Sequence, residues 1–124
     1  MKFDLENLNP GTWFYFVDED DGTVSELTAG VCLRIAPPAE VRRITAACEK
    51  KGKTPDLAKF DRLLWDYCIV DWQGIEDANG ESIECTPDSK VALMGGAPDF
   101  SRFVSEKLAE LRETQLSERD LEKN

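Results

Sequence analysis

The 124-residue sequence contains no histidine. Without histidine, the commonest general base is missing, and neither a Ser–His nor a Cys–His nucleophile can be built. The cysteines at positions 32, 48, 68 and 85 form no Cys-x-x-Cys pair, and histidine cannot complete a zinc site. We expect them to be free thiols buried as small hydrophobic side chains, with a disulfide or metal site as the alternative. The sequence thus predicts no cofactor and no catalytic activity.

Long apolar runs and phosphate-binding loops are also missing. No apolar run approaches the ~20 residues that a membrane span needs. Residues 1–6 lack the apolar segment of a secretory signal. Gly95-Gly96 lacks the flanking pattern of a Walker or dinucleotide loop. With 41% hydrophobic and 32% charged residues, the composition is typical of one globular domain, and we expect a cytoplasmic protein.

Bases are scarce relative to acids. The 25 acidic and 15 basic residues give a net charge of −10, which argues against binding to nucleic acid or to an anionic membrane. Residues 42–62 hold seven bases and three acids, whereas residues 63–89 hold seven acids and no base. Two solvated faces of opposite charge are the simpler interpretation. The alternative is electrostatic complementarity between copies of the protein or with a partner helix.

The N-terminal part predicts a β-hairpin. Residues 12–17 are rich in aromatic and β-branched side chains, and residues 27–35 are typical of a returning strand. The acidic residues 18–22 between them fail as a calcium loop, because Val17 would occupy its first position and Thr28 its twelfth. We therefore expect an exposed turn within a hairpin, with a hairpin extended by a third strand as the alternative.

Four helices follow, each opened by a proline-containing start. These starts are Pro38, Thr54-Pro55-Asp56, Thr86-Pro87-Asp88 and Pro98-Asp99. Thr54 is the expected N-cap of the second helix, and Gly52 the expected C-terminal cap of the first. Gly95-Gly96 is expected to end the third. The predicted fold class is α+β: an N-terminal β-hairpin or small antiparallel sheet packed with about four helices.

The last helix has the clearest amphipathic pattern. Its apolar residues recur at i, i+3, i+4, i+8 and i+11 and are Phe100, Phe103, Val104, Leu108 and Leu111. We predict that this face binds a partner protein. Beyond it the apolar spacing loosens, so residues 1–112 are expected to form a single domain. Residues 113–124 are expected to form a charged helical extension or a disordered tail.

Residues 69–80 are the most distinctive stretch. A short apolar run leads to Trp72, then Gly74, and an acidic turn closes at Asn79-Gly80, a strong turn signal because both residues tolerate positive φ. We expect Trp72, Gly74, Asp77 and Gly80 to form a structural motif in which Trp72 anchors the turn on the core.

This motif carries a family resemblance. Trp72-x-Gly74-Ile75, Asp77-x-x-Gly80, then Thr86-Pro87 and a helix, is similar to the W-x-G-(V/I)-x-D-x-x-G passage of small tail-assembly proteins of tailed bacteriophages. The order of elements resembles theirs over residues 12–112, and the similarity is sharp over residues 69–94. The resemblance implies a non-enzymatic chaperone in the bacterial host cytoplasm. Such a chaperone binds the tape-measure protein, keeps it soluble and helps tail-tube subunits polymerise around it.

Other interpretations stay open. A homo-oligomer is compatible with the sequence. An acidic inhibitor that mimics nucleic acid would need acids aligned on one face and no apolar strip. A hydrolase using carboxylates would need a pocket around Asp71, Glu76 or Asp77 with a raised pKa.

Overall fold

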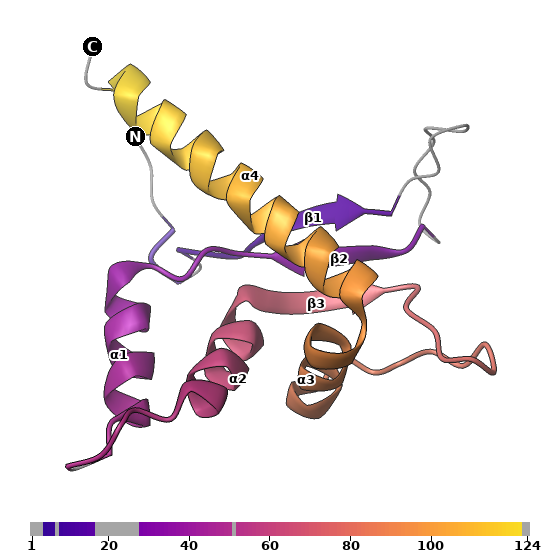
Figure 1. The fold of residues 1–124 in the computed structure, drawn as a ribbon. Coiled ribbons are helices and arrows are strands. Elements are labelled where there is room, and N and C mark those ends of the chain that lie inside the picture. Colours follow the sequence, from indigo (N-terminus) through magenta and orange to yellow (C-terminus); the bar gives the residue numbers. More distant parts are fainter. Residues whose placement is uncertain (1–3, 7, 17–27, 51, 123–124) are drawn as a thin grey trace.

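Over its described residues the chain folds into one antiparallel sheet and four helices, which confirms the predicted α+β class. The computed structural model describes residues 4–6, 8–16, 28–50 and 52–122, with side chains up to Gln115. Figure 1 shows the elements in chain order. They are β1 (Thr12–Tyr15), β2 (Gly30–Leu33), α1 (Pro38–Cys48), α2 (Leu57–Cys68), β3 (Ile69–Gln73), α3 (Pro87–Gly96) and α4 (Pro98–Glu122).

The three strands are ordered β1-β2-β3, and both pairs are antiparallel. Trp13 lies opposite Cys32 in the first pair, and Val31 lies opposite Trp72 in the second. The register of β2 and β3 shifts between Cys32 and Leu33. The predicted strands 12–17 and 27–35 thus pair as expected over their described parts. The acidic turn 18–22 lies outside the described residues.

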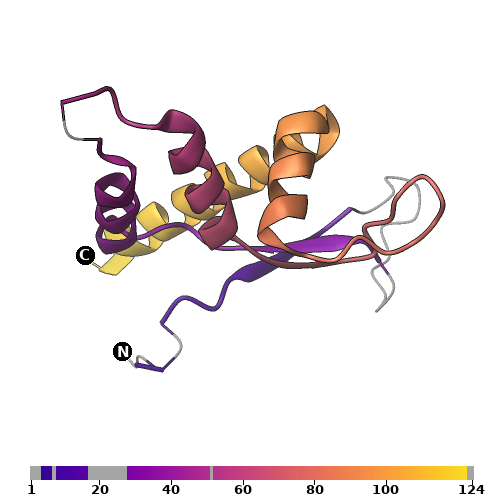
Figure 2. The same ribbon diagram turned by 90° about the horizontal axis from the view of Figure 1, so that it is seen from below.

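All four helices lie on the same face of the sheet (Figure 2). Side chains alternate between the faces of β1 and β2, whereas in β3 the register shift places Ile69 and Trp72, three residues apart, in the core. The resulting core consists of Val31, Leu33, Ile69, Trp72, Phe100 and Val104, with Phe14 and Phe16 packed against it. The other face carries Trp13, stacked on Tyr15 with ring centroids 6.2 Å apart, and Val70. Trp13 and Val70 are exposed.

Two predicted helix boundaries are wrong. Asp56, not Thr54, caps α2: its carboxylate accepts a hydrogen bond from the Lys59 N–H at 3.1 Å. The Asp56 N–H donates to the carbonyl of Cys48, so tertiary contact places the cap two residues later. This capping holds the pKa of Asp56 below its ordinary value. Gly52 does not cap α1, which ends at Cys48, but forms a tight turn at φ +72°.

The third helix begins and ends close to its predicted positions, and the fourth begins at its predicted Pro98. Thr86 is the N-cap of α3, and its hydroxyl accepts from the Ser89 N–H at 3.1 Å while the Ser89 hydroxyl accepts from the Thr86 N–H at 2.9 Å. This reciprocal pair satisfies two backbone donors that the helix leaves free. The helix α4 continues through Glu122. None of the described helices combines the length and apolar composition that a bilayer crossing requires.

A buried lysine joins α2 to α3. Lys90 is 7% exposed, and its ammonium donates to the carbonyl and the carboxylate of Asp66 at 3.1 and 3.0 Å. The Asp66 side chain itself is 44% exposed. The two partners of this ion pair are therefore solvated very differently.

Removing one partner should consequently cost more than removing the other. We expect Asp66→Ala to lower the free energy of unfolding by about 1–3 kcal/mol, because it leaves a buried ammonium with one neutral acceptor. Lys90→Met should cost less, because it fills the same space and leaves a carboxylate in water. Urea denaturation of both variants measures the difference, and an equal or reversed order would contradict this account.

Candidate functional site

The residues around Trp72 build a structural corner. The Trp72 ring is 7% exposed, meets the Phe100 ring edge-on at 5.8 Å, and donates its Nε1–H to the carbonyl of Ile83 at 2.7 Å. The Ile83 N–H in turn donates to the carbonyl of Ile75 at 2.8 Å. Trp72 therefore anchors the loop of residues 75–83 on the core.

The acidic turn in this loop is held by its own side chains. The Asp77 carboxylate accepts from the N–H groups of Asn79 and Glu81 at 2.8 and 3.0 Å. Gly80 has φ +79°, a left-handed conformation in which glycine is not strained. Asp77 and Gly80 thus close the turn by local hydrogen bonding and backbone geometry.

The carboxylates proposed for hydrolysis lie apart from the cavities. Asp71, Glu76 and Asp77 are exposed, and none of them lines any of the three cavities described below. Among the described residues, no three acidic or cysteine side chains come together in a way that would hold a metal ion. The positions of these carboxylates therefore do not support the hydrolase hypothesis.

The predicted partner-binding face of α4 packs on the protein's own sheet. Phe100 and Val104 are core residues, 7% and 1% exposed. Phe103 stacks on Phe16 with ring centroids 3.9 Å apart. Leu108 and Leu111 are partly buried against the same core. Phe100 is therefore covered in the folded domain, whereas Val104 and Leu108 also line the groove described next.

An apolar groove lies between α4 and the pair α1–α2. The helix α4 packs on α3 and on β2, and α1 packs on α2, while α4 makes few direct contacts with α1 or α2. Figure 1 shows α4 running across the sheet and away from these two helices. The space left between them is a cavity of about 340 Å³. Its lining residues are Ile35, Ala36, Val41, Phe60, Leu64, Trp65, Cys68, Ile69, Met94, Val104, Ser105, Leu108 and Arg112.

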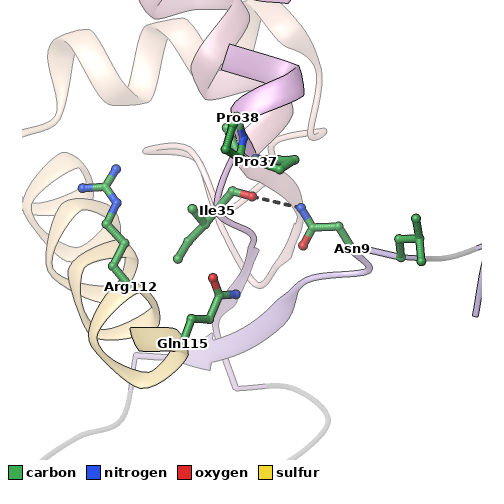
Figure 3. A pocket seen from close by; sticks show the side chains of 8 residues that line it. Asn9, Ile35, Pro37, Pro38, Arg112 and Gln115 are labelled. Atoms are coloured by element: carbon green, nitrogen blue, oxygen red, sulfur yellow. Dashed lines mark hydrogen bonds between the residues drawn. The ribbon is translucent and has the colours of Figure 1, made fainter. Parts of the chain in front are cut away.

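A second cavity of about 600 Å³ continues the groove toward the N-terminal segment. The two cavities share Ile35, Ala36 and Arg112. Figure 3 shows the second cavity, bounded by α4 and by the segment that joins β2 to α1. Its other lining residues are Leu8, Asn9, Pro37, Pro38 and Gln115. A third cavity of about 230 Å³ adjoins it beneath residues 8–12.

A polar network fixes one wall of the groove. The Asn9 amide donates to the carbonyl of Ile35 at 2.9 Å and to the Tyr67 hydroxyl at 3.0 Å. The Arg34 Nε donates to the carbonyl of Tyr67 at 2.7 Å, and its guanidinium lies 3.8 Å from the centre of the Tyr67 ring. These bonds tie the N-terminal segment to the end of α2. The wall is therefore preorganised.

Among the described residues that line the two connected cavities, Arg112 supplies the only charge. None of the ion pairs among the described residues includes it. The groove is thus lined mainly by apolar residues, with a guanidinium where the two cavities meet. An apolar ligand segment that carries a carboxylate would match this arrangement.

The cysteine at the groove floor is not a reactive thiolate. Burial raises the pKa of Cys68, against the smaller opposing effects of the Ala36 N–H, Arg112 and Arg34. Burial also raises the pKa of Cys32 and of Cys85. These three thiols therefore stay protonated at neutral pH, and a thiol is a poor nucleophile. All four cysteines are free, and Cys85 is less buried than the others.

Sequence reasoning missed the groove because no single element contains it. A partial signal was present: Val41, Phe60 and Leu64 are apolar residues of α1 and α2 that a small three-stranded sheet does not fully cover. Comparisons of this chain with protein-family models, with curated proteins and with solved structures give no match. Its function is therefore inferred from the motif and the groove.

Proposed function

We propose that this chain is a non-enzymatic phage or prophage tail-assembly chaperone that binds an amphipathic helix of the tape-measure protein. The observation that carries the proposal is the apolar groove between α4 and the α1–α2 pair. The resemblance of the Trp72-x-Gly74 passage to tail-assembly proteins supplies the identity of the partner. The groove supplies a physical means of holding it.

The groove suits the apolar face of a helix. Helix-in-groove recognition places side chains at i, i+3, i+4 and i+7 into a hydrophobic channel. Here Val41, Phe60 and Leu64 line one wall, and Met94 and Leu108 line the other. The flexible side chain of Met94 can adapt to differently shaped ligand residues. A long helical partner offers many apolar segments, so an adaptable lining is an advantage.

Charge favours the same kind of complex. Arg112 would pair with a carboxylate on the bound helix and so fix its position along the groove. The net charge of −10 would keep the complex soluble while apolar segments of the partner are covered. Non-specific association with phage DNA is disfavoured by the same charge.

The acidic-inhibitor alternative is less well supported. It requires acids in a row and no apolar strip, whereas the groove is an apolar strip. In addition, the carboxylate of Asp77 is engaged by the backbone of its own turn. Acids of residues 76–84 are exposed, as in most solvated turns.

Coexpression with the long helix-rich reading frame encoded nearest downstream tests the proposal. We expect the partner to stay soluble and to be recovered with the tagged chain. Val41→Glu places a charge on the groove wall, at a residue already 36% exposed, and should weaken recovery at least about tenfold because the complex would bury that charge. Arg112→Glu should weaken it in the same direction.

Leu57→Glu is the matched control. Leu57 also lies on a helix of the α1–α2 pair, but it is 70% exposed and lines neither cavity. Recovery should be unchanged, and circular dichroism should show all three variants folded. An insoluble partner, or equal recovery with Val41→Glu and with Leu57→Glu, would reject the groove as the binding site.

A further inference from the structure

Among the residues that the structure describes, the strand β1 has an open edge. In the order β1-β2-β3 it pairs with β2 on one side only. The Phe16 N–H donates to the carbonyl of Ala29 at 2.8 Å, so residues 16, 14 and 12 direct their backbone groups toward β2. Trp13 and Tyr15 therefore direct theirs outward. No hydrogen bond from another described residue reaches these outward groups.

The opposite edge of the sheet is protected, and β1 is not. On β3, the outward N–H of Trp72 donates to the carboxylate of Asp71 at 2.8 Å. Edge strands are commonly defended by such charges, by lysine or by proline. Residues 12–16 contain none of these. An aromatic, uncharged edge with free backbone groups is therefore available for pairing with another strand.

We propose that this edge joins two copies of the chain through antiparallel β1–β1 pairing about a twofold axis at Phe14. In that register Trp13 of one copy lies opposite Tyr15 of the other, and both residues present outward backbone groups. Opposite residues of such a pair exchange two hydrogen bonds, so the two symmetric pairs make four. The edge is thus complementary to itself, and the product is a continuous six-stranded sheet.

Side chains and charge favour a second copy as the occupant. Trp13 and Tyr15 share the face of the sheet that the helices leave open, so pairing sets an aromatic residue opposite an aromatic residue. Residues 8–16 carry no charge, so the strand edge itself adds no charge repulsion between two copies. Lys107 of α4 lies 5.8 Å from the centre of the Phe14 ring and pairs with Glu110. Because Phe14 lies on the proposed twofold axis, Lys107 of one copy and Glu110 of the other can meet across that axis.

The interface is small, so the dimer should be reversible. A four-residue strand edge buries less than the ~1,200 Å² of a standard stable interface. Sedimentation equilibrium of the full chain should show a monomer at low and a dimer at high concentration. In hydrogen exchange, the amides of Trp13 and Tyr15 should become protected as concentration rises. This inference does not depend on the proposed function.

Tyr15→Pro tests the geometry. Proline removes the outward N–H of residue 15 without removing a hydrogen bond to β2, and should weaken dimerisation at least about tenfold. Tyr15→Ala is the matched control, because it also removes the ring but keeps the N–H, and it should dimerise more strongly than Tyr15→Pro. A monomer at every concentration overturns the proposal. So does a dimer whose Trp13 and Tyr15 amides stay unprotected, because its interface would lie elsewhere.

Discussion

Replacing Trp72 by alanine should lower the free energy of unfolding by about 3–5 kcal/mol, the cost of removing a large aromatic ring from a core. Two interactions disappear together. The edge-on contact with Phe100 at 5.8 Å joins β3 to α4, and the 2.7 Å hydrogen bond to the Ile83 carbonyl fixes the loop of residues 75–83. Urea denaturation followed by circular dichroism measures the loss.

Two further variants separate these contributions. Trp72→Phe retains most of the ring but leaves the Ile83 carbonyl without its donor, and should cost about 1–3 kcal/mol. Val70→Ala removes a side chain that is 37% exposed on the other face of the same strand, and should cost less than about 1 kcal/mol. If Trp72→Ala lowered the free energy of unfolding by as little as Val70→Ala does, Trp72 would not be the anchor that its contacts indicate.

Gly74→Ala should destabilise the fold more than Gly80→Ala, although the two glycines have similar φ angles of +68° and +79°. A left-handed conformation costs alanine roughly 1–2 kcal/mol at either position. At Gly80 a Cβ would meet nothing within 4 Å, so this is the whole expected cost. At Gly74 a Cβ would lie 2.9 Å from the Cα of Ala29, which is backbone and cannot rotate away.

The added collision should raise the cost of Gly74→Ala to about 2–5 kcal/mol. Urea midpoints of the two variants, compared at constant slope, measure the difference. Equal destabilisation would mean that residues 28–30 can move away from the added Cβ without a cost in free energy. Gly74 would then be required for its backbone angle alone. Gly74 would then no longer determine how closely β3 approaches the β1–β2 loop.

The two proposals, if both hold, have a joint consequence. A dimer through β1 would carry two grooves, one on each copy. A long helical partner with several apolar segments could then occupy both, and the second binding event would be intramolecular. Tyr15→Pro should in that case reduce recovery of the partner without altering the groove, whereas Val41→Glu should reduce it without altering dimerisation.

Local patterns predicted most of the elements. The aromatic and β-branched run of residues 12–17 indicated β1, and Thr86-Pro87-Asp88 marked the start of α3. The Trp72–Gly80 passage indicated a turn, because glycine and Asn-Gly tolerate positive φ wherever they occur. The cap of α2 was missed, because Thr54 and Asp56 are both good caps and a contact with Cys48 favours the second.

The amphipathic pattern of α4 shows why a sequence pattern alone does not locate a binding surface. An apolar stripe at helical spacing looks the same whether it packs on its own sheet or on another protein, and Phe100 and Val104 pack on the sheet. The sequence by itself determined the elements, their order and which faces are apolar, because these depend on neighbouring residues. Only the tertiary structure decided which apolar faces meet and which stay open. The groove beside Val41 exists because α4 crosses the sheet away from α1 and α2. The edge at Trp13 is open because no strand among the described residues pairs with β1 on the side away from β2.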